Sequence, residues 1–113
     1  MKIKELSILP YPGRAFLARN RKDFVKAHAL LFKRAANIYE TTDGICAWQA
    51  DDEGYSYLLW GDDRDTLSHE LSHLILDVFQ RIGIDPREAN GEPFCYMLSH
   101  LLNQVEKNYG KRS

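Results

Sequence analysis

The spacing of apolar residues in the N-terminal third predicts a strand followed by a helix. Charged and apolar side chains alternate over residues 2–9, and the run stops at Pro10-Tyr11-Pro12-Gly13, which is typical of a strand entering a turn. From about residue 20 to residue 36, apolar side chains recur at helical spacing. His28 falls on the apolar face of this predicted helix, where a histidine is more often a core residue than a ligand.

Two short runs rich in aromatic and branched residues follow, at residues 45–50 and 55–60. The polar stretch Asp51-Asp52-Glu53-Gly54 separates them, so we expect a β-hairpin with a short turn. A second helix is predicted after residue 65 and should stop at Gly83. A last helix should open near Asn90, with Pro93 in its first turn, and run toward residue 108.

This order of strand, helix, hairpin, helix and helix predicts a small α+β domain with a short antiparallel sheet. A chain of 113 residues fits one domain with one core, so residues 1–113 are expected to fold as a single unit. Apolar residues make up 44% of the chain and charged residues 27%, which is ordinary for a globular protein.

No segment has the length of apolar sequence that a membrane span or a signal peptide needs, so we expect a cytoplasmic protein with no membrane partner. Cys46 and Cys95 form no CxxC pair, which favours free thiols and disfavours a metal site built on cysteine.

The net charge of −1 hides an uneven distribution. Residues 1–34 hold nine Lys and Arg against two Asp and Glu, whereas residues 35–65 hold one against eight. A basic face over residues 14–34 leaves nucleic-acid binding open as a weak alternative. Solvated faces of a strand and a helix are the favoured interpretation, because no aromatic-interleaved basic stripe accompanies the charge.

The stretch TLSHELSHLILDVF at residues 66–79 carries the strongest chemical signal. His69 and His73 are four positions apart, so on a helix they lie about 40° apart around the axis and roughly 6 Å apart along it. Two imidazoles in that relation can hold one metal ion. Glu70 sits at the flank of this face, where a carboxylate can act as general base on a water molecule.

An active-site zinc usually takes three protein ligands, so one more donor is expected downstream. The candidates are Asp77, Glu88, Glu92, Cys95 and His100. Glu92 is favoured because it begins a second rigid helix, where the helix dipole favours a carboxylate. Asp77, one turn after His73, is expected to orient a histidine instead.

HELSH at residues 69–73, with NGEPFCYMLSHLL from Asn90, resembles the gluzincin-type zinc metallopeptidases. It is similar in particular to small minigluzincin-like predicted peptidases of phages and prophages, over roughly residues 54–105. The resemblance implies a minimal zincin-like domain with His69, His73 and Glu92 as zinc ligands and Glu70 as base. Larger gluzincins often carry an aspartate one turn after the ligand glutamate, where this chain has Tyr96.

The expected function is therefore a zinc-dependent hydrolase, most simply a metallopeptidase acting on a peptide or protein substrate. Tyr96 and His100 are candidate catalytic donors to the oxyanion. Peptidases of this kind hold substrate along an exposed sheet edge, which residues 55–60 could supply unless that strand is interior. The alternative is a non-catalytic zinc-containing module that engages a host or phage protein.

Overall fold

The computed structural model describes residues 2–109 and contains a four-stranded sheet and three α-helices. A short 3-10 helix, η1, precedes the last helix. In chain order the elements are β1 (Ile3–Leu6), β2 (Arg14–Ala18), α1 (Arg21–Phe32), β3 (Gly44–Asp51), β4 (Gly54–Gly61), α2 (Arg64–Ile82), η1 (Glu88–Gly91) and α3 (Glu92–Tyr109).

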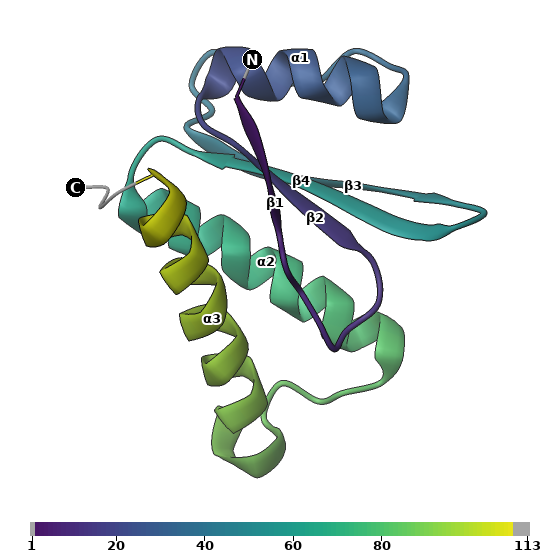
Figure 1. The fold of residues 1–113 in the computed structure, drawn as a ribbon, viewed down its shortest axis with the longest axis vertical. Helices are drawn as coiled ribbons and strands as arrows, with labels where there is room; N and C mark the ends of the chain where they lie inside the picture. The colour runs from purple at the N-terminus through teal and green to yellow at the C-terminus, as the bar shows by residue number, and fades with distance from the viewer. Residues whose placement is uncertain (1, 110–113) are drawn as a thin grey trace.

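The sheet has the strand order β1-β2-β4-β3 (Figure 1). β1 pairs antiparallel with β2, and β3 pairs antiparallel with β4, which confirms the predicted hairpin. β2 and β4 run parallel, so the sheet is mixed where a wholly antiparallel one was expected. The reason is that the chain leaves β2, crosses through α1, and places β4 rather than β3 beside β2. The predicted α+β class is confirmed.

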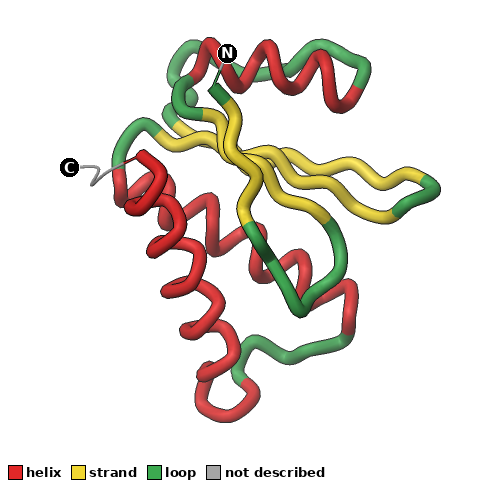
Figure 2. The backbone as a smooth tube through the Cα atoms, viewed as in Figure 1, coloured by secondary structure: helices red, strands yellow, loops and turns green. Residues whose placement is uncertain are grey.

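Helices cover both faces of the sheet (Figures 1 and 2). α1 lies on one face, where Phe24 and Phe32 pack with Leu58 and Trp60 of β4. His28 is buried between the two phenylalanines and its Nδ1 lies 3.0 Å from the carbonyl oxygen of Arg34, which confirms it as a core residue. α2 and α3 pack together on the opposite face.

The ends of α2 follow from its sequence. The carboxylate of Asp63 accepts a hydrogen bond from the backbone N–H of Thr66 at 2.8 Å and caps the first turn. Gly83 ends the helix in the left-handed conformation, with φ of 80°, as the sequence predicts. Between them a buried stripe faces the sheet, made of Leu67, Leu71, Leu74, Ile75, Val78 and Phe79.

Two glycines let α2 approach the hairpin closely. A Cβ at Gly61 would lie 2.7 Å from the Cα and the backbone N of Leu67, so the end of β4 touches the helix backbone itself. A Cβ at Gly44 would lie 2.5 Å from a methyl group of Thr66 and 3.3 Å from the Cγ of Glu70. The first turns of α2 are thereby held against the start of β3.

α3 runs antiparallel to α2. Its first turn lies beside the end of α2, where Phe94 meets Phe79 with ring centroids 6.5 Å apart. Its last turns lie beside the start of α2, where Glu106 forms a 2.7 Å salt bridge with Arg64. No helix within residues 2–109 is long and apolar enough to cross a membrane.

Candidate metal centre

His69 and His73 form a pair on the outer flank of α2. Their Nε2 atoms lie 3.1 Å apart, both residues are exposed, and the rings meet edge to face with centroids 4.6 Å apart. Two nitrogens that share a tetrahedral zinc ion at roughly 2.0–2.1 Å would lie about 3.3 Å apart. The pair therefore fits one zinc ion with a shift of a few tenths of an ångström.

Glu70 points from the same helix toward β3. It is 8% exposed and lines a cleft of about 360 Å³ between α2 and β3, together with Gly44, Ile45, Cys46, Trp48, Tyr57, His73 and Asp77. Burial raises the pKa of Glu70, the charges of His69 and His73 oppose that shift, and Asp43 adds to it. The structure thus brings the predicted base to the cleft beside the histidine pair.

Asp77 closes the other end of this cleft. Its carboxylate accepts a 2.5 Å hydrogen bond from the Tyr57 hydroxyl and a 2.6 Å hydrogen bond from Nε of Arg81. The guanidinium carbon of Arg81 lies 3.7 Å from the ring centroid of Tyr55 and 4.3 Å from that of Trp48. Asp77 is therefore engaged with Tyr57 and Arg81 and not with a histidine, contrary to the expectation from sequence.

Glu92 lies apart from the histidine pair. α2 continues from His73 to Ile82, which is roughly 13 Å of helix, before the chain turns back. Because Phe94 packs beside Phe79, the exposed Glu92 at the start of α3 lies near the far end of α2. Among the described residues, no three His, Cys, Asp or Glu side chains are grouped to hold a metal ion.

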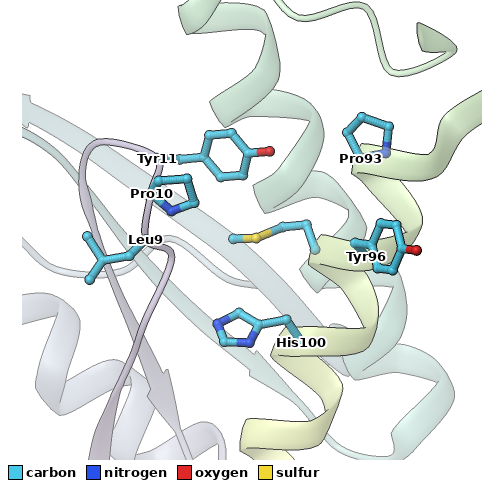
Figure 3. A pocket seen from close by; sticks show the side chains of 7 residues that line it. Leu9, Pro10, Tyr11, Pro93, Tyr96 and His100 are labelled. Carbon is cyan, nitrogen blue, oxygen red and sulfur yellow. The ribbon is translucent and has the colours of Figure 1, made fainter. Parts of the chain in front are cut away.

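Tyr96 and His100 line a different pocket, of about 300 Å³ (Figure 3). Its walls come from α3 and from the β1–β2 loop, with Leu9, Pro10, Tyr11, Pro93 and Met97. Gln104, which contacts Nε2 of His100 at 3.0 Å, also bonds to the backbone of Ser7. This pocket is on the β1 side of the sheet, whereas the histidine pair is on the β3 side, so Tyr96 and His100 do not join the pair.

Sequence reasoning missed several residues of the cleft. Cys46 and Trp48 of β3, Tyr57 of β4 and Arg81 of α2 all face it or close it. The period-2 alternation of β3, which places Cys46 and Trp48 on one face, was the available signal. The candidate edge, residues 55–60, belongs to the interior strand β4, and β3 is the edge beside α2.

Comparisons with known proteins give no match: no family model, no curated protein and no solved structure is significantly similar to this chain. The candidate chemistry of this site therefore rests on its geometry.

Proposed function

We propose that this protein is a zinc-dependent hydrolase that cleaves a peptide bond or a related amide. The observation that carries the proposal is the 3.1 Å separation of the His69 and His73 Nε2 atoms beside the buried carboxylate of Glu70. Two converging imidazoles and a base that opens into a cleft supply two of the usual three metal ligands and the general base of metal-assisted hydrolysis.

His69 and His73 would hold the ion, and zinc when bound supplies a Lewis acid that polarises the scissile carbonyl. Glu70 takes a proton from the attacking water and delivers it to the leaving amine. Because Glu92 lies near the far end of α2, the described residues offer the ion two ligands, His69 and His73, rather than the usual three. We therefore expect weaker zinc binding than at a three-ligand site.

The cleft has a natural place for an extended substrate. β3 is an edge strand, and it forms one wall of the cleft that contains Glu70 and His73. A peptide added to that edge would gain backbone hydrogen bonds along the strand. Its amide bonds would then pass beside the histidine pair.

Glu70→Gln tests the assignment of the base. The variant should still bind zinc, and hydrolysis of a peptide library should fall by about 10²–10⁴-fold, the usual contribution of a positioned general base. His69→Ala should lose both zinc and hydrolysis. Glu88→Gln, an exposed acidic residue of η1, is the matched control and should change neither. Hydrolysis at the rate of the unmodified protein in purified Glu70→Gln would exclude this mechanism.

A non-catalytic binding module is the second candidate, and the position of Glu92 favours it. A site with two protein ligands lacks the third ligand that catalytic zinc sites usually have, which argues against efficient catalysis. A biological effect of the protein that survives Glu70→Gln would assign it to this class. An effect lost with Glu70→Gln but kept with Glu88→Gln would assign it to the hydrolases.

A further inference from the structure

The two edges of the sheet are built differently. β1 has four residues, IKEL, and carries the charged side chains of Lys4 and Glu5. β3 has eight residues, and no charged side chain occurs from Gly44 to Ala50. Charged side chains and shortness protect an edge from pairing with another chain. β1 is both short and charged, whereas β3 is long and has no charged side chain over most of its length.

A groove follows the unprotected edge. Five consecutive residues of β3, Cys46 to Ala50, line a hollow of about 580 Å³ together with Arg34. Consecutive residues of a strand point to opposite faces, so a hollow that all five reach must run along the strand edge itself. β3 pairs only with β4 within the described sheet, and its alternate N–H and C=O groups face this groove.

Both ends of the edge are acidic. Asp43 precedes β3, and its carbonyl oxygen accepts a 2.9 Å hydrogen bond from the N–H of Asp62, which brings a second exposed carboxylate to that end. At the other end the turn holds Asp51, Asp52 and Glu53, all exposed. Negative charge therefore brackets a neutral stretch.

This charge pattern disfavours a second copy of the chain as the occupant. Antiparallel pairing of two β3 strands would set the Asp43 end of one copy against the acidic turn of the other. The acidic ends of β3 favour instead a peptide segment with a positively charged residue at each end. Arg34 lines the groove beside the uncharged residues Cys46 to Ala50, so a positive residue in the central part of the segment would meet like charge.

We propose that β3 captures, as an added strand, an extended peptide whose neutral stretch of about seven residues is flanked at both ends by Lys or Arg. Seven residues of strand span about 24 Å, the length of the uncharged part of the edge. This peptide class is the substrate class of the hydrolase proposed above, and in that respect it rests on the proposed function. Capture itself requires no metal, so binding and hydrolysis can be measured separately.

The first test uses two labelled peptides that share a centre of alternating Thr and Val and differ in their ends, with two Lys or two Glu on each side. Fluorescence anisotropy is measured with metal-free protein in chelator. At low salt the Lys-ended peptide should bind about tenfold more tightly or better, and the difference should shrink at high salt. Equal affinities, a preference for the Glu-ended peptide, or no binding of either would overturn the proposal.

Charge reversal in the protein provides the matched control. Asp52→Lys should weaken binding of the Lys-ended peptide and strengthen binding of the Glu-ended one. Glu88→Lys makes the same change in net charge at an exposed residue outside the sheet, and it should leave both affinities unchanged. Identical responses from the two variants would show that net charge, and not the edge, selects the peptide.

Backbone N-methylation of the peptide tests strand pairing directly. Methylation at the odd positions and at the even positions gives two peptides with unchanged charge. Only alternate amides of an added strand donate to the edge, so one peptide should lose at least about tenfold in affinity and the other should not. Equal effects, or sedimentation as a dimer that excludes peptide, would refute capture at β3. If only one of the two methylated peptides loses affinity, but the protein neither binds zinc nor hydrolyses peptides, then peptide capture at β3 is supported and the proposed hydrolase is rejected.

Discussion

The Tyr57→Phe variant removes one hydroxyl group and tests how much the hydrogen bond between Tyr57 and Asp77, at one end of the cleft, contributes to stability. The Tyr57 hydroxyl donates to Asp77 at 2.5 Å, and burial together with this bond raises the pKa of Tyr57 above its usual value. Tyr57 is 1% exposed, so its ring lies in the core. The change to Phe keeps this ring and removes the hydroxyl group alone.

The expected loss follows from the charge and exposure of the acceptor. A hydrogen bond to an ionised group contributes about 1.5–3 kcal/mol. The Asp77 side chain is 26% exposed, so water can replace part of the lost bond. We expect Tyr57→Phe to lower the free energy of unfolding by about 1–2 kcal/mol. For a domain of this length, that corresponds to a fall in Tm of roughly 4–8 °C.

Urea denaturation followed by far-UV circular dichroism measures the effect, in a cycle with Asp77→Ala and the double variant. The coupling energy should be about 1 kcal/mol, because the two groups are in direct contact. Tyr39→Phe removes a hydroxyl from a tyrosine that is 75% exposed and should leave the free energy of unfolding unchanged. If Tyr57→Phe matches Tyr39→Phe, or the coupling energy is zero, the account of the cleft is refuted.

Three further predictions follow from other contacts. Gly61→Ala should destabilise the fold by about 1–3 kcal/mol in urea denaturation, because its Cβ would meet the backbone of Leu67, and unchanged stability would contradict that contact. Burial raises the pKa of Cys46 to about 12, whereas Cys95 is exposed. Iodoacetamide at mildly alkaline pH should therefore modify Cys95 far faster than Cys46, as measured by peptide mass mapping. Equal labelling of the two cysteines would contradict the burial of Cys46. Glu92→Gln should leave zinc affinity unchanged in a chelator competition, and a loss of affinity would contradict the observed arrangement of α2 and α3.

The elements that sequence predicts correctly are those fixed by local patterns. The hairpin follows from two alternating runs around a polar turn, and the end of α2 follows from Gly83. β2 was missed because it has only five residues, RAFLA, and they do not alternate between apolar and polar side chains. Its parallel pairing with β4 depends on the crossover through α1, which no local pattern encodes.

The same distinction applies to the candidate site. His69, Glu70 and His73 lie within two turns of one helix, so helical geometry alone predicts their arrangement. Glu92 belongs to another helix, and its position depends on how far α2 extends past His73 and on the loop that follows. Spacing along the chain does not fix either of these. Tyr96 faces the β1–β2 loop for the same reason.

Zinc binding to the purified, untagged protein is the most direct test of the central claim that His69 and His73 share one ion. Elemental analysis after equilibrium dialysis against zinc should find one zinc per chain in the unmodified protein and in Glu92→Gln. It should find none in the His69→Ala and His73→Ala variants, while His100→Ala, which removes an exposed histidine on the β1 side, should retain the ion. An unmodified protein that takes up no zinc, or His69→Ala that keeps it, would contradict the account.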